Sequence, residues 1–60
     1  MPGKFVIRKG ASGQYHFNLV STNGEVVATS ETYTSKQSCQ QGIEAVRRLA
    51  ADATVEDQTG

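Results

Sequence analysis

The sequence contains very few of the residues that usually reinforce a small domain. Its single cysteine, Cys39, excludes a disulfide bond within the chain. Because His16 is the only histidine, no set of three or four soft ligands can form in one protomer, which excludes a structural zinc site. There is also no glycine-rich phosphate loop, so we expect no metal and no cofactor.

Long apolar runs and an excess of one charge are also missing. No stretch approaches the length that crosses a bilayer, so we expect no membrane partner and, by default, a cytoplasmic protein. Six basic and six acidic residues cancel, which argues against nucleic acid as a partner. A weak nucleic-acid hypothesis stays open, because a dimer would double one basic patch. The patch consists of Lys4, Arg8, Lys9, Arg47 and Arg48.

The length of 60 residues leaves room for only one thin core. A chain of this size buries about 60% of the surface that its unfolded form exposes. Domains this small usually depend on disulfides, a metal or self-association. With the first two excluded, the sequence predicts an oligomer.

Alternating apolar and polar residues predict an antiparallel meander of three strands. The strands lie at about 4–9, 14–21 and 25–31. Asn23-Gly24 predicts a two-residue type I′ turn between the second and third strands. Between the first and second strands several loops are possible, and burial favours a three-residue loop at 11–13, in which Gly13 supplies the left-handed residue, over a loop one residue longer.

These turns determine the register of the sheet. They place Ile7 opposite Phe17, and Leu19 opposite Ala28. One face then carries the apolar side chains that a helix would cover. They are Phe5, Ile7, Phe17, Leu19, Val26 and Ala28.

A single amphipathic helix follows at about 36–50, with Ser35 as its N-cap. Its apolar stripe matches the uncovered sheet face and consists of Cys39, Ile43, Val46 and Ala50. The pattern predicts an α+β domain over residues 1–60. A short segment at 53–57, which contains Val55, is a weak fourth strand that no turn ties back to its own helix.

Several short motifs follow one another in a characteristic order between Gly3 and Val55. They are Gly3-Lys4-Phe5, Ile7, Tyr15-His16-Phe17, Asn23-Gly24-Glu25, Ser30-Glu31, Tyr33, Ser35-Lys36 and Gly42-Ile43. In this order and spacing the chain resembles the YegP-like family of small bacterial proteins, a domain of unknown function. The resemblance brings no activity with it.

The resemblance implies a β-β-β-α-β unit that occurs as a tandem repeat or as a homodimer of single units. In such a pair the units form one continuous sheet and exchange their C-terminal strands. For this single unit it implies a homodimer in which Thr54–Asp57 pairs with the partner. The family often has arginine where this chain has His16. A role of that arginine in the family is therefore not carried over to His16.

A row of polar side chains is predicted on the outer face of the sheet, away from the helix. It consists of Arg8, His16 and Glu31. A binding or proton-transfer site is one interpretation. A solvated ladder of charges is the interpretation that we favour, because such cross-strand pairs are common on exposed sheet faces.

A second candidate site lies where the third strand leads into the helix. Tyr33, Ser35 and Lys36 belong to a segment dense in hydroxyl groups at a helix N-terminus, where an anion can bind. The favoured interpretation is again structural, with Ser35 capping the helix and Tyr33 closing the end of the core.

No catalytic set emerges from these residues. Cys39 and His16 are expected on opposite sides of the sheet, so Cys39 is expected to be a buried apolar residue. We therefore predict a non-enzymatic, dimeric binding or interaction module with no catalytic residues. The alternative is an enzyme or small-ligand site formed across the dimer around His16, Glu31 and Tyr33.

Overall fold

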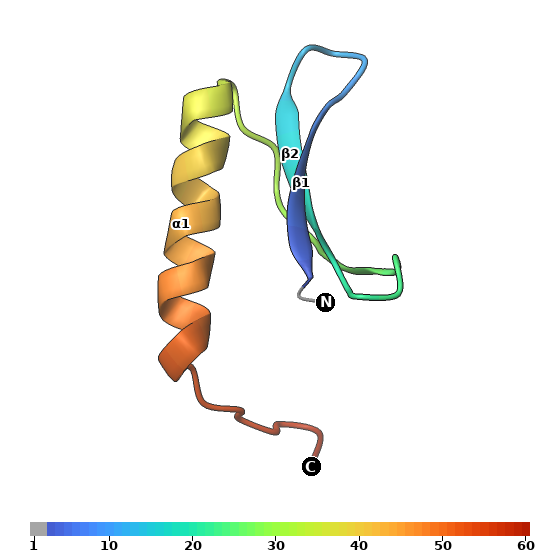
Figure 1. The fold of residues 1–60 in the computed structure, drawn as a ribbon. Helices are drawn as coiled ribbons and strands as arrows, with labels where there is room; N and C mark the ends of the chain where they lie inside the picture. Colours follow the sequence, from blue (N-terminus) through green and yellow to red (C-terminus); the bar gives the residue numbers. More distant parts are fainter. Residues whose placement is uncertain (1–2) are drawn as a thin grey trace.

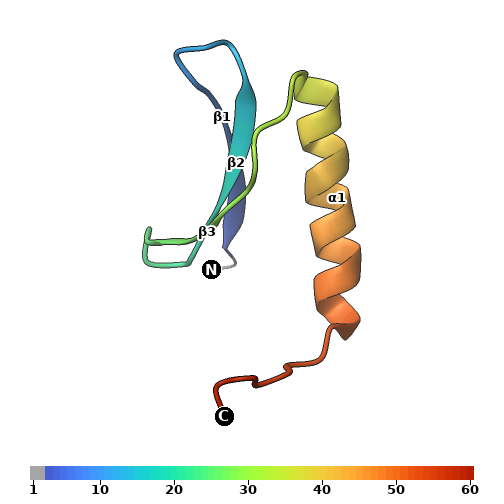
Figure 2. The ribbon, with the colours of Figure 1, turned by 180° about the vertical axis from the view of Figure 1, so that it is seen from behind.

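Three strands precede one helix in the computed structural model, which describes residues 3–60. The elements are β1 at Lys4–Lys9, β2 at Tyr15–Val20, β3 at Val26–Thr29 and α1 at Lys36–Asp52. The strands form one antiparallel sheet in the order β1-β2-β3. The helix lies along one face of this sheet, as Figures 1 and 2 show from opposite sides. The predicted α+β meander with one covering helix is confirmed.

The first hairpin has the predicted loop and the predicted register. Gly10 N donates to Gln14 O at 2.8 Å, and Gly13 N donates to Gly10 O at 3.0 Å. Gly13 has a φ of 84°, which a residue without Cβ adopts without strain. Ile7 therefore pairs with Phe17.

The second hairpin has a three-residue loop, so the predicted type I′ turn is wrong. Ser21 N donates to Glu25 O at 2.8 Å, and Gly24 N donates to Ser21 O at 3.0 Å. Only Gly24, with a φ of 87°, is left-handed there, whereas type I′ would require the same of Asn23. The Asn23 side chain instead accepts from the Ser21 hydroxyl and donates to Glu25 Oε1, which holds the loop in its observed shape.

A β-bulge restores the predicted pairing of Leu19 with Ala28 despite the longer loop. Val20 pairs with Val26, so Val27 is an extra residue in β3. Because Val20 and Leu19 point to opposite faces, Val26 lies with Val20 on the face away from α1. The predicted inclusion of Val26 in the helix-facing apolar set is therefore wrong.

Strand β3 is shorter than predicted because Ser30 ends the ladder. Its hydroxyl accepts from Phe17 N at 2.9 Å and donates to Glu31 O at 2.8 Å. Phe17 N therefore donates to a side-chain oxygen of Ser30 instead of to a backbone carbonyl. Two backbone bonds between Tyr15 and Tyr33, at 2.7 and 2.8 Å, then bring the chain back beside β2. Glu31 therefore lies outside the ladder and does not pair with His16.

The helix begins at the predicted cap and continues beyond its predicted end at Ala50. Ser35 Oγ accepts from Ser38 N at 3.1 Å. Cys39 is completely buried, whereas Leu49 is 66% exposed. In Figure 1 the last turns of α1 extend past the ends of β1 and β2, so the C-terminal end of the helix lies beyond the sheet.

The segment 53–60 leads away from the end of α1 and is exposed throughout. Val55 is 97% exposed. In the described part of the chain this segment forms no strand, because a strand needs backbone partners and none lies beside it. The predicted fourth strand is therefore not formed by one chain alone.

A row of three aromatic rings forms the centre of the core. Phe5 meets Phe17 edge to face at 5.7 Å between ring centroids, and Phe17 stacks on Tyr33 at 6.3 Å. Tyr33 in turn rests on the helix at Gly42, where an added Cβ would lie 2.8 Å from Tyr33 Cζ. The absence of a side chain at Gly42 allows the helix to approach the ring.

Two further features follow from residues 3–60 as described. No helix among them has the length and apolar character that a membrane crossing requires. No group of three histidine, cysteine, aspartate or glutamate side chains gathers there to hold a metal ion.

We predict that Gly42→Ala lowers the free energy of unfolding by about 1–2 kcal/mol, because the added methyl group displaces the Tyr33 ring. In a Tyr33→Ala background the same substitution should instead stabilise by about 0.5–1 kcal/mol, the ordinary gain of alanine over glycine in a helix. Urea denaturation measures both, with Gly10→Ala as a control at a glycine whose nearest contact is 3.7 Å away. Equal losses in both backgrounds would contradict the proposed contact.

Candidate functional site

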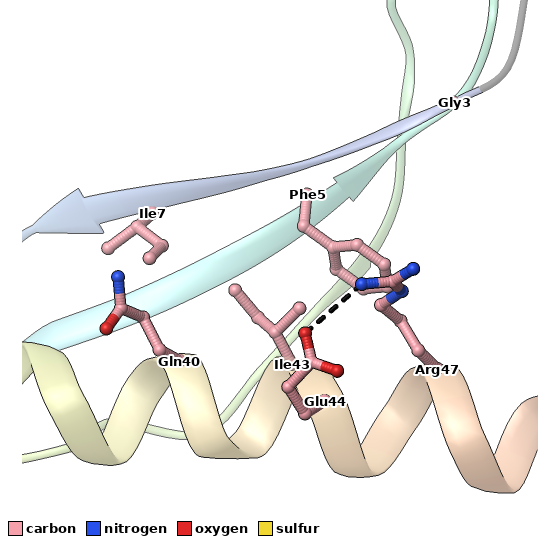
Figure 3. A pocket seen from close by; sticks show the side chains of 7 residues that line it. All are labelled: Gly3, Phe5, Ile7, Gln40, Ile43, Glu44 and Arg47. Carbon is pink, nitrogen blue, oxygen red and sulfur yellow. Dashed lines mark hydrogen bonds and ion pairs between the residues drawn. The ribbon is translucent and has the colours of Figure 1, made fainter.

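A cleft of about 560 Å³ separates the edge strand β1 from α1. We call it the β1–α1 cleft (Figure 3). It is lined by Gly3, Phe5, Ile7, Gln40, Ile43, Glu44 and Arg47. Since the chain brings together the start of β1 and the middle of α1, the cleft is a product of the tertiary fold.

The floor of the cleft is apolar and its helix side is polar. Figure 3 shows Phe5 and Ile7 pointing from β1 toward the helix, where Ile43 lies between them. Glu44 Oε2 and Arg47 Nη1 form an ion pair of 3.1 Å on the helix side. Both side chains are more than 60% exposed, so the pair contributes little to stability.

One end of the cleft is basic. A second cavity of about 500 Å³ shares Phe5 and Ile7 with the first, and we call it the basic end. Its other lining residues are Arg8, Lys9, Tyr15 and Lys36. Lys9 Nζ lies 5.5 Å from the centre of the Tyr15 ring, a cation–π contact, and Lys36 is the first residue of α1. The residues that line this end include three cations and no carboxylate.

Strand β1 also offers its backbone to a partner. Within residues 3–60 it pairs only with β2, so the N–H and C=O groups of its other side point out of the sheet. Such an edge accepts a further strand. The β1–α1 cleft can therefore receive an extended segment by backbone bonds and by side-chain burial together.

A smaller apolar groove of about 330 Å³ lies on the other side of the helix, over β2 and β3. We call it the β3 groove. It is lined by Phe5, Phe17, Leu19, Ala28, Thr29, Ser30, Glu31, Tyr33 and Val46. It is open because α1 meets the sheet along β2 and leaves β3 exposed.

The outer face of the sheet carries a polar ladder in which Asn18 is the central residue. Arg8 Nε donates to Asn18 Oδ1 at 2.7 Å, and Asn18 Nδ2 donates to Thr29 Oγ1 at 3.0 Å. Asn18 is only 7% exposed. Arg8 is opposite His16 in the register as predicted, but its bond goes to Asn18. The sequence analysis missed Asn18, whose only signal is an amide in the central strand.

The predicted anion-site residues separate in the structure. Lys36 lies at the basic end with Arg8, whereas Ser35 caps the helix and donates its hydroxyl to Ser38 Oγ at 3.0 Å. Tyr33 belongs to the aromatic core and, with Glu31, lines the β3 groove.

The predicted composite site is not assembled within one chain. His16 alternates with Phe17 along β2, so it points to the face opposite Tyr33. Cys39 lies on the helix side and is fully buried, and burial raises the pKa of its thiol. The thiol of Cys39 and the phenol of Tyr33 thus lie on the helix side of the sheet, and the imidazole of His16 lies on the other side.

Comparison with known proteins identifies the family. Residues 11–57, more than half of the chain, match the family described as "Domain of unknown function (DUF1508)". The chain belongs to this family. A UPF0339 protein of Treponema denticola is 51% identical over 55 residues, which cover 92% of this chain and 95% of the relative. The YegP protein of Yersinia pestis is 49% identical over 45 residues, so the predicted YegP-like resemblance is confirmed.

Relatives in the DUF1508 family differ in length. The aligned part covers 44% of a UPF0339 protein of Pseudomonas aeruginosa and 40% of the Yersinia YegP protein, so the chain spans less than half of each. A solution structure of a Haloferax volcanii protein resembles this fold with a TM-score of 0.83 at 40% identity. That similarity covers 93% of this chain and 95% of the Haloferax chain, which supports the fold over nearly its whole length.

We expect Asn18→Ala to cost about 1–3 kcal/mol of unfolding free energy, because it removes two hydrogen bonds, to Arg8 and to Thr29, each worth about 0.5–1.5 kcal/mol. Glu31→Ala should cost less than about 0.5 kcal/mol, since Glu31 is exposed and outside the ladder. Chemical denaturation of both variants measures the difference. A loss above about 2 kcal/mol for Glu31→Ala would restore the predicted charge row as a stabilising feature.

A second expectation concerns the buried thiol. Because the folded state raises the pKa of Cys39, the contribution of Cys39 to the free energy of unfolding should be constant below the ordinary thiol pKa and should fall as the pH rises above it. Ellman's reagent should label Cys39 slowly in the folded protein and rapidly in urea. Denaturation from pH 7 to 10 tests the first point, with Cys39→Ala as the control that lacks this loss. Rapid labelling of the folded protein would show that the thiol is accessible.

Proposed function

We propose that this DUF1508 domain is a non-enzymatic interaction module that works as a homodimer, with Thr54–Asp57 of each copy exchanged into the other. One observation carries the proposal. An exposed tail with an apolar residue, Val55, coexists with open strand edges that lie beside apolar cavities. Each feature is unfavourable in water alone, and the two complement one another.

The thin core supports association. Phe17, Val20 and Cys39 are the apolar side chains buried within residues 3–60 of a single chain. Burying Val55 against a partner contributes about 1.5–3 kcal/mol, and the dimer has two such residues. For a domain of this size, that gain is a large fraction of total stability.

The lengths of the relatives agree with a unit that works in pairs. The Treponema relative has room for one unit, whereas the Pseudomonas relative is about twice as long as the aligned segment. A pair of units can be completed within one chain that contains two units. It can equally be completed by two chains that contain one unit each.

The separation of reactive groups supports a binding role over an enzymatic one. His16 and Cys39 occupy opposite sides of the sheet, and the cavities present cations and apolar side chains instead. The free thiol of Cys39 supports a reducing, cytoplasmic setting. The candidate surface for a small anion or an acidic segment is the basic end, with Arg8, Lys9 and Lys36.

Sedimentation equilibrium at micromolar concentration should show a dimer of the full chain. Val55→Asp should weaken the dimer by at least tenfold, because it places a carboxylate where an apolar side chain is buried. Gln58→Asp adds the same charge outside the exchanged segment and serves as the matched control. A stably folded monomer of the unsubstituted chain would refute the proposed assembly.

A further inference from the structure

We infer that the open edge of β3 receives an extended segment of a partner protein, in which a bulky apolar residue enters the β3 groove and a lysine or arginine beside it meets Glu31. The inference rests on the interaction role in the proposed function. It adds the surface that is used and the chemistry of the partner, and it does not depend on the exchange of the tail.

The backbone of β3 presents polar groups along its outer edge. Within residues 3–60 this strand pairs only with β2. Ser30 N donates to Phe17 O at 2.9 Å, so the alternation of an antiparallel ladder turns the N–H and C=O groups of Thr29 to the opposite side. These groups face the open edge, where an added strand can form hydrogen bonds with them.

The regular part of this edge is the part that borders the groove. Short strands and bulges protect sheet edges from unwanted pairing, and β3 has both features. The bulge lies at Val27, however, whereas Ala28 and Thr29 pair regularly with β2. An added strand therefore finds an undistorted ladder beside the groove.

The β3 groove is apolar and has room for one large side chain. Ala28 lies at its centre, opposite Leu19, and Val46 lines it from the helix. Val46 is still 37% exposed, because α1 meets the sheet along β2. Every second side chain of an added strand points to the helix side, so the residue beside Ala28 would cover Val46 as well.

The charge at this edge is negative. Glu31 is the charged residue among those that line the groove, and it is exposed. The ion pair within residues 3–60 joins Glu44 to Arg47, so the carboxylate of Glu31 has no cation in that part of the chain. Glu25 adds a second carboxylate at the other end of β3. A lysine or arginine in the added segment complements these charges.

The same carboxylates disfavour this chain itself as the occupant. Two β3 strands in antiparallel pairing would bring Glu25 of one copy toward Glu31 of the other. The tail carries Glu56 and Asp57, which are also acidic. Like charges on neighbouring strands destabilise the pair, so this edge selects a basic segment from another protein.

Two synthetic peptides with blocked ends test the site in the full chain. They are Thr-Lys-Thr-Leu-Thr-Lys-Thr and Thr-Glu-Thr-Leu-Thr-Glu-Thr, in which the charged side chains share one strand face with leucine. In NMR titrations of the isotope-labelled protein, the basic peptide should shift the amide signals of Val27, Thr29 and Glu31. The acidic peptide should bind about tenfold more weakly at low salt. Alanine in place of leucine in the basic peptide should also weaken binding about tenfold.

The location of the shifts decides whether the peptide occupies this edge. No shift in β3 at millimolar basic peptide would overturn the inference. Shifts confined to β1 or to the basic end would overturn it as well.

Glu31→Lys tests which carboxylate recognises the segment. It should reduce the preference for the basic peptide from about tenfold to below about threefold, because the cation of the peptide then meets a like charge. Asp52→Lys makes the same change of charge at the end of α1, outside the groove, and should leave the preference unchanged. A full preference in Glu31→Lys would overturn the inference.

Sedimentation equilibrium separates this inference from the proposed dimer. Glu31→Lys should leave the dimer unchanged. A dissociation constant altered by more than about tenfold would assign the β3 edge to a second copy and overturn the inference. A monomer that still binds the basic peptide at β3 would remove the proposed exchange and leave the β3 site intact, so the two failures are distinguishable.

Discussion

The ring of Tyr33 is the contact on which the arrangement of sheet and helix depends. It stacks on Phe17 from the sheet and lies against the backbone of the helix at Gly42. Its own backbone exchanges two hydrogen bonds with Tyr15, which fix the connecting segment beside β2. One residue thus joins the sheet, the connection and the helix, and it determines where α1 crosses the sheet.

Because this anchor lies near the centre of the sheet, the helix leaves both edges open. The β1 edge borders a cleft with an apolar floor and a basic end, and the β3 edge borders a smaller apolar groove. The second half of α1 and the tail remain largely exposed, with Leu49 and Val55 unburied. A chain of this size buries only a thin core by itself, and the proposed dimer would compensate for that deficit.

The two faces of the sheet have different chemistry. The outer face holds the Arg8–Asn18–Thr29 ladder, in which each hydrogen bond satisfies a polar group on a central or flanking strand. The inner face holds the aromatic row and the fully buried thiol of Cys39. This division keeps His16 away from Cys39 and Tyr33 within one chain.

Features that depend on neighbouring residues followed from the sequence by itself: the Ser35 cap, the left-handed Gly13 and the pairing of Ile7 with Phe17. Only the tertiary structure decided the bulge at Val27 and the burial of Asn18, because packing across strands determines both. Half of the site was visible in advance, since Arg8 and Lys36 were candidates. Their meeting with Lys9 required the start of α1 to lie near the end of β1, which no local pattern specifies.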